Sequence, residues 1–78
     1  MSASRTEAVA DCRRMLRGFS GAPDPRRHGR RIASTLAAAT GWTPEARREI
    51  EALAVWLSES PPENALRLRC QAVLDKLA

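Results

Sequence analysis

The segment 24–41 constrains the fold of this chain more than any other part. It opens with Asp24, a good helix cap, and Pro25, which suits a first helical turn because its missing N–H would have no partner there. It closes with Gly41, a common helix terminator. Its large apolar and alanine positions recur at helical spacing: Ile32, Leu36 and Ala39. The pattern predicts a helix over 25–40 that buries one face in a core.

The opposite face of this helix is basic. It carries four arginines, Arg26, Arg27, Arg30 and Arg31. Positive charges near a helix N-terminus oppose the macrodipole at about 0.3 kcal/mol or more each, so local helix stability does not account for them, whereas an acidic partner would. Gly29 in the second turn weakens the helix by up to about 1 kcal/mol relative to alanine. It signals either close helix packing or a helix that begins nearer Gly29.

Three more helices are predicted, over 5–18, 44–58 and 61–77. Ser4 with Glu7, three residues on, forms a capping box at the start of the first. Thr43 precedes Pro44 just as Asp24 precedes Pro25, so we expect Thr43 to be the N-cap of the next helix and Pro44 its first residue. Ser60 stands before two prolines and an acidic residue, which predicts a cap with both prolines in the first turn. No alternation typical of strands occurs.

The predicted fold class is all-α: a compact four-helix bundle with short loops, forming a single helical domain over 1–78. The hydrophobic residues make up 44% of the chain, enough for a folded core. The expected core consists of Val9, Cys12, Leu16, Phe19, Ile32, Leu36, Ile50, Leu53, Leu57, Leu66, Cys70, Val73 and Leu77, with Trp42 and Trp56 as large plugs. Leu74 joins the apolar stripe of the last helix.

The charge of the chain is positive and uneven. The 78 residues carry a net charge of +4, and twelve of the thirteen basic residues are arginine. Eight of those arginines fall in residues 1–41, where only three acidic residues oppose them. A GC-rich genome gives the same arginine bias without any function. A basic surface otherwise favours acidic partners, and Arg13 and Arg17, together with Arg14, extend it if the first two helices are neighbours.

No pattern of catalytic chemistry occurs. His28 is the only histidine, and no acidic pair or nucleophile stands beside it in sequence, so we expect a half-buried or surface side chain and no enzyme. There is no phosphate-binding loop or metal-ligand spacing, which predicts no cofactor and no metal. No apolar run approaches a membrane span or a signal peptide, and we expect a cytoplasmic protein. Cys12 and Cys70 are expected as buried free thiols, with a disulfide between them as the alternative.

The segment 32–57 resembles a helix-turn-helix in its layout, with Gly41 at the turn. Arg47 stands where that motif places an apolar residue. The second helix bears three acidic residues, Glu45, Glu49 and Glu51, which DNA phosphates would repel. We therefore do not expect a helix-turn-helix repressor.

Two hypotheses of function follow. The first is a non-enzymatic binding module that occupies a surface of an acidic protein or a nucleoprotein complex. Its predicted partner-binding residues are Arg26, Arg27, Arg30, Arg31, Arg13 and Arg17. Small basic inhibitors of host nucleic-acid machines made by phages and mobile elements, such as anti-CRISPR proteins, have this size and charge. The alternative is a regulator that binds DNA or RNA directly without sequence preference.

A second apolar stripe predicts a homodimer. The last helix carries small residues around a leucine on the side away from its main stripe, and one valine of the preceding helix points outwards. A four-helix core that buries the main apolar stripe of the last helix cannot also bury these residues. The predicted dimer-interface residues are Ala65, Leu68, Ala72 and Val55.

Overall fold

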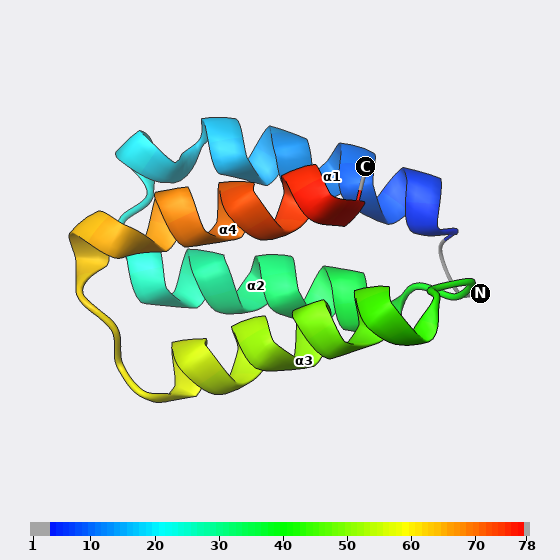
Figure 1. The fold of residues 1–78 in the computed structure, drawn as a ribbon. Helices are drawn as coiled ribbons and strands as arrows, with labels where there is room; N and C mark the ends of the chain where they lie inside the picture. Colours follow the sequence, from blue (N-terminus) through cyan, green and yellow to red (C-terminus); the bar gives the residue numbers. More distant parts are fainter. Residues whose placement is uncertain (1–3, 78) are drawn as a thin grey trace.

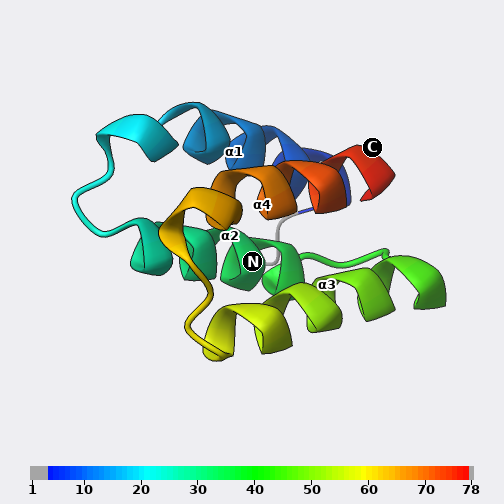
Figure 2. The same ribbon diagram turned by 60° about the vertical axis from the view of Figure 1, so that its left-hand side comes forward.

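The computed structural model describes residues 4–77, and they form an all-α four-helix bundle, as predicted. The helices are α1 (Arg5–Arg17), α2 (Pro25–Ala38), α3 (Pro44–Ser58) and α4 (Glu63–Leu77), with one short 3-10 helix, η1 (Phe19–Gly21), after α1. Successive helices run antiparallel and lie side by side (Figure 1). The second view places α1 and α4 on one side of the bundle and α2 and α3 on the other (Figure 2). The helix α2 contacts all three of its neighbours.

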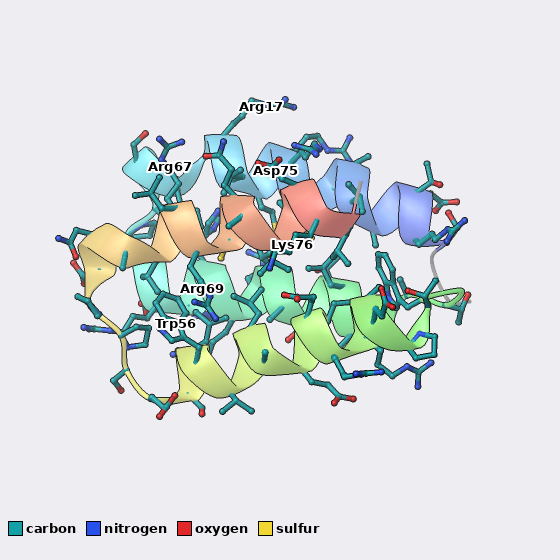
Figure 3. The ribbon with its side chains drawn as sticks, in the orientation of Figure 1. Arg17, Trp56, Arg67, Arg69, Asp75 and Lys76 are labelled. Carbon is teal, nitrogen blue, oxygen red and sulfur yellow. The ribbon has the colours of Figure 1, made fainter. Side chains whose placement is uncertain are left out.

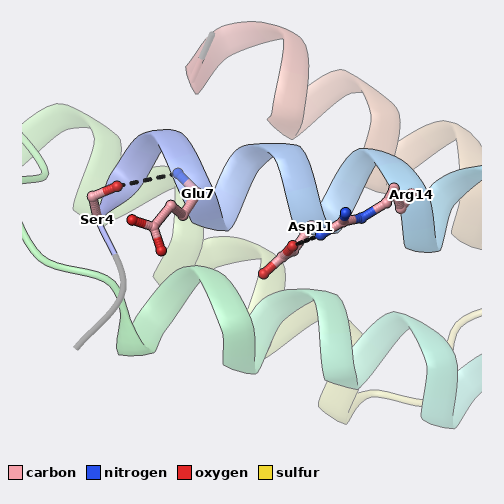
Figure 4. A network of polar contacts seen from close by, with 4 residues as sticks. All are labelled: Ser4, Glu7, Asp11 and Arg14. Carbon is pink, nitrogen blue, oxygen red and sulfur yellow. Dashed lines mark hydrogen bonds and ion pairs between the residues drawn. The ribbon is translucent and has the colours of Figure 1, made fainter. Parts of the chain in front are cut away.

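Three helices begin at the predicted N-cap residues, although among residues 4–77 no bond from the Ser4 amide to the Glu7 carboxylate completes the predicted capping box. The Ser4 hydroxyl accepts a hydrogen bond from the Glu7 amide at 3.2 Å (Figure 4). The Asp24 carboxylate accepts one from the Arg27 amide at 3.1 Å, and the Thr43 hydroxyl accepts one at 3.1 Å at the start of α3. Each cap satisfies an amide that has no partner within the helix. The bounds of α3 are those predicted.

The end of α2 differs from the prediction. The helix stops at Ala38 rather than at residue 40, and Ala39 is already extended. The Trp42 indole donates a hydrogen bond to the Leu36 carbonyl at 2.7 Å. This carbonyl is the one that the amide of residue 40 would need to continue the helix, so the tryptophan ends α2 early. Gly41 then takes a φ of +93°, which turns the chain into α3.

The start of α4 was also wrong in the prediction. The helix begins at Glu63 rather than at residue 61, and Ser60 has a φ of +53°, so it is not an extended N-cap. Pro61 is buried, and its carbonyl accepts a hydrogen bond from the Arg26 side chain at 3.1 Å. The linker therefore packs back on α2 before the helix starts.

The core contains the predicted large residues with four exceptions. Val9, Leu77, Trp42 and Trp56 were expected in it but are only half-buried and pack against its edge. Small residues missing from the expected core are buried as well, namely Ala8, Gly29 and Ala33, and so is Ala39, which its spacing placed on the buried face of the helix. A Cβ built on Gly29 would stand 3.1 Å from Leu57 Cδ2 and 3.7 Å from Phe19 Cζ. The glycine therefore marks close packing, and the alternative of a later helix start is wrong.

The two cysteines are buried free thiols, and the disulfide alternative does not hold. The Cys12 thiol faces the Ile32 carbonyl at 3.5 Å. Burial raises the pKa of Cys12 from its ordinary 9.0 to about 12, with smaller contributions from the nearby Asp11 and Cys70 charges. Burial alone raises the pKa of Cys70 to about 11. Both thiols therefore stay protonated in the folded protein at neutral pH.

These thiols predict a loss of stability in alkaline solution. Between pH 9 and the raised pKa values, the unfolded chain releases thiol protons that the folded chain keeps. The free energy of unfolding should then fall as the pH rises, by up to about 1.4 kcal/mol per pH unit for each thiol, and should show no such dependence below about pH 8. Urea unfolding of the wild type and of a Cys12→Ala, Cys70→Ala variant measures the effect. An equal alkaline loss in both proteins would contradict the assignment to the thiols.

Candidate binding surface

The single histidine lies at the junction between α1 and α2. His28, half-buried as predicted, forms a hydrogen bond through Nε2 with the Met15 carbonyl near the end of α1. Its ring meets the Phe19 ring edge-on, with the centroids 4.8 Å apart. These contacts, with that of Cys12 to the Ile32 carbonyl, hold α1 and α2 side by side. The structure thus meets the condition under which arginines of the first helix extend the basic surface of the second.

The four arginines of α2 differ in exposure and in their contacts. Arg27, Arg30 and Arg31 are exposed, and within residues 4–77 none of them forms an ion pair. Arg26 is half-buried instead. It donates to the Pro61 carbonyl at 3.1 Å and lies 3.9 Å from the Glu63 carboxylate. Arg26 therefore helps to hold the linker and the first turn of α4 against α2, while the other three remain free for a partner.

The arginines of α1 divide in the same way. Arg13 is half-buried and lies 3.6 Å from the Asp75 carboxylate of α4. Arg17 is exposed and projects away from the bundle (Figure 3). Arg14 lies on the side of α1 that faces α2, where it lines a surface hollow together with Arg31 of α2. Of the arginines of α1, Arg14 is thus the one that joins the surface of α2, although Arg13 and Arg17 ranked above it in the sequence.

We call Arg14, Arg27, Arg30 and Arg31 the arginine face, with Arg30 at its edge, where it lines a hollow together with Ala54 and Leu57 of α3. Two carboxylates lie within it. Asp11 contacts Arg14 across one helical turn (Figure 4). Asp24 lines the hollow that holds Arg27 and Arg31, and its carboxylate is already engaged by the helix cap. The face keeps a positive excess, and guanidinium groups match carboxylates and phosphates through paired hydrogen bonds. Three of these four were predicted from the sequence, but periodicity could not select Arg14 over Arg13 and Arg17, because it does not show which flank of a helix meets which neighbour.

The structure also places the four predicted dimer-interface residues. Leu68 is 64% exposed and Val55 61%, and they are the large hydrophobic side chains that the described part of the chain leaves exposed. Ala72 is exposed and Ala65 is half-buried. All four lie on α3 and α4, whereas the arginine face lies on α1 and α2.

Comparison with known proteins found no match to a family model, to a curated protein or to a solved structure. Among residues 4–77, no three histidine, cysteine, aspartate or glutamate side chains gather as metal ligands would. In the same range, the helices are too short and too polar for any of them to cross a membrane.

Proposed function

We propose that this chain is a non-enzymatic binding module whose arginine face docks on an acidic surface of a macromolecular partner. The observation that carries the proposal is the separation of roles among the arginines. Arg13 and Arg26 are used in ion pairs with α4, whereas Arg27, Arg30 and Arg31 are exposed and have no ion-pair partner among residues 4–77. Exposed like charges held on a rigid helix are poorly placed for stability and well placed for rapid, salt-sensitive association.

The biological setting that we propose is inhibition of a host nucleic-acid machine by a phage or mobile element, as anti-CRISPR proteins do. Such a module needs a small rigid scaffold and one charged contact surface, and it needs no catalytic group. Homodimerisation belongs to the same proposal, with Ala65, Leu68, Ala72 and Val55 as its contact residues, because a paired module would present two arginine faces.

Direct binding of DNA or RNA is the second candidate. The observation that favours it is the spacing of Arg27 and Arg31, which are four residues apart on one helix and line the same hollow. Residues at that spacing are about 5–6 Å apart at Cβ, so both can reach phosphates of one strand.

One comparison of variants tests the proposal. We expect the Arg27→Glu, Arg31→Glu variant to lose roughly 10- to 100-fold in affinity for polyglutamate, and the wild-type affinity to fall steeply as salt is raised. The matched control is Arg47→Glu with Arg48→Glu, which reverses two exposed charges on α3 and should change the affinity little. Fluorescence anisotropy with labelled polyglutamate measures both.

The same assay separates the candidates. Labelled duplex DNA and single-stranded RNA replace polyglutamate at equal salt. Tighter, salt-dependent binding of either nucleic acid, lost in the Arg27→Glu, Arg31→Glu variant, would favour the second candidate. Equal losses in the α2 and α3 variants would show that net charge alone acts, and would contradict both.

A further inference from the structure

The faces of α3 and α4 that turn away from the core form one apolar surface. Val55 and Leu68 are more than half exposed. Three alanines lie on the same two helices at helical spacing from them: Ala52 and Ala72 are exposed, and Ala65 is half-buried. Trp56, next to Val55, is half-buried and lies between the two helices (Figure 3). We call these six residues the α3–α4 face.

Trp56 gives this face a candidate anchor. The guanidinium of Arg69 on α4 lies over its ring, 5.3 Å from the centroid, so the tryptophan already bridges the two helices (Figure 3). Tryptophan and arginine are the residue types most enriched at the energetic centres of interfaces. The ring retains exposed surface that a partner would bury.

The charges around this face indicate which kind of partner would bind it. Away from α2 the exterior of α3 is acidic, since Glu45, Glu49 and Glu59 outnumber Arg48, while Glu51 and Arg47 line a hollow against α2. The side of α4 that meets α3 is basic, since Arg69 and Lys76 lie there, whereas Glu63 and Asp75 pair with Arg26 and Arg13. A surface with an acidic helix beside a basic one is complementary to itself when it is turned by 180° about an axis along the helices.

We infer that the α3–α4 face binds a second copy of this chain, with α3 of each copy packed antiparallel on α4 of the other. This arrangement repeats the pairing within one chain, where Lys76 lies 3.5 Å from Glu49 and Arg69 stacks on Trp56. At that register, Arg69 lies level with the partner's Trp56, and the partner's Glu59 stands about one helical turn away, within reach of the guanidinium. The arginine faces lie on the outside of the dimer, so it binds an anionic partner through two sites. The inference deepens the dimer of the proposed function but does not depend on what the arginine face binds.

The mass in solution tests the dimer. Sedimentation equilibrium of the wild type alone, over a wide range of concentration, should show a reversible dimer. Leu68→Glu should raise the dissociation constant at least about tenfold. The matched control, Ala10→Glu, adds the same charge at an exposed position of α1 and should leave the mass unchanged. Circular dichroism establishes that both variants fold. A wild type that is monomeric throughout the range, or a Leu68→Glu variant that stays dimeric, would overturn the inference.

A charge exchange tests the orientation. Arg69→Glu alone places a carboxylate against the partner's Glu59, and Glu59→Arg alone places two guanidiniums together, so each variant should dimerise more weakly than the wild type. Mixed together, the two variants regain both opposite-charge pairs and should form a heterodimer close to wild-type affinity. A mixture that stays as weak as its components would rule out packing of α3 on the partner's α4.

The outcomes for the dimer and for the arginine face are separable. Arg27→Glu with Arg31→Glu should leave the dimer mass unchanged while it weakens polyglutamate binding. Leu68→Glu should leave the affinity for a short soluble glutamate peptide unchanged, and should lower retention on densely immobilised polyglutamate by roughly 100-fold, because the two-site contact is lost. Retention that is unchanged in the Leu68→Glu variant would show that the chain binds through one face at a time.

Discussion

Replacing Leu53 by alanine should lower the free energy of unfolding by about 3 kcal/mol. The Leu53 side chain is completely buried in the core cluster, on the inner face of α3. Its removal loses the transfer free energy of the side chain and leaves a cavity that four closely packed helices close only in part. A domain of 78 residues has a total stability of roughly 4–12 kcal/mol. This one substitution should therefore remove a quarter or more of it.

Urea unfolding followed by circular dichroism measures the Leu53→Ala effect. The control is Leu77→Ala, the same chemical change at a half-buried position of α4. It should cost less than half as much, because fewer packed atoms are lost. Equal losses at the two positions would show that the inner face of α3 is not buried in the core as described. A thermal melt should show the same order, with the Leu53→Ala midpoint roughly 12–24 °C below the wild type.

Replacing Gly29 by leucine should destabilise the bundle by about 2–3 kcal/mol through overpacking. Three elements meet this glycine, because a Cβ at its position would lie 3.1 Å from Leu57 of α3, 3.7 Å from Phe19 of η1 and 4.0 Å from Leu66 of α4. A leucine side chain has no space there without moving at least two of them. The junction also carries the His28 ring, which packs on Phe19, so the effect should reach the α1–α2 contact.

Two further substitutions serve as controls for Gly29→Leu. Gly29→Ala should be close to neutral, because the gain in helix propensity of up to about 1 kcal/mol offsets a tight contact with the flexible end of Leu57. Ala38→Leu, at an exposed position at the end of α2, should change the free energy of unfolding by less than about 0.5 kcal/mol. A Gly29→Leu variant as stable as the wild type in urea unfolding would contradict the close approach of the helices.

The arginine face changes how the basic character of the chain is understood. The arginines of the chain do not all have the same role. Arg13 and Arg26 fasten α4 to the first two helices, and Arg69 packs on an aromatic ring of α3. The exposed arginines of α2 are left with no such structural use among the described residues. A partner that neutralises them would also relieve their unfavourable placement near the N-terminus of the helix.

The sequence by itself determined the four helices, because their signals are local. Caps at Ser4, Asp24 and Thr43 and the apolar spacing of each helix depend on residues within one or two turns. The same locality explains the errors. The last turn of α2 is stopped by Trp42, and the start of α4 is set where Arg26 holds Pro61. The first contact is a side-chain bond over six residues that helical periodicity does not include, and the second is tertiary and joins residues 35 positions apart.

Only the tertiary structure decided which residues of the candidate surfaces share a role. Helical periodicity gives the angle of a side chain about its own axis, but not which neighbour lies at that angle. It therefore grouped Arg26 with Arg27, Arg30 and Arg31, although Arg26 turns to α4. It also ranked Arg13 above Arg14, although Arg14 is the one that lies beside Arg31. The stripe with Leu68 and Val55 was found from the sequence because exposure on the outer face of a helix requires only that no neighbour cover it.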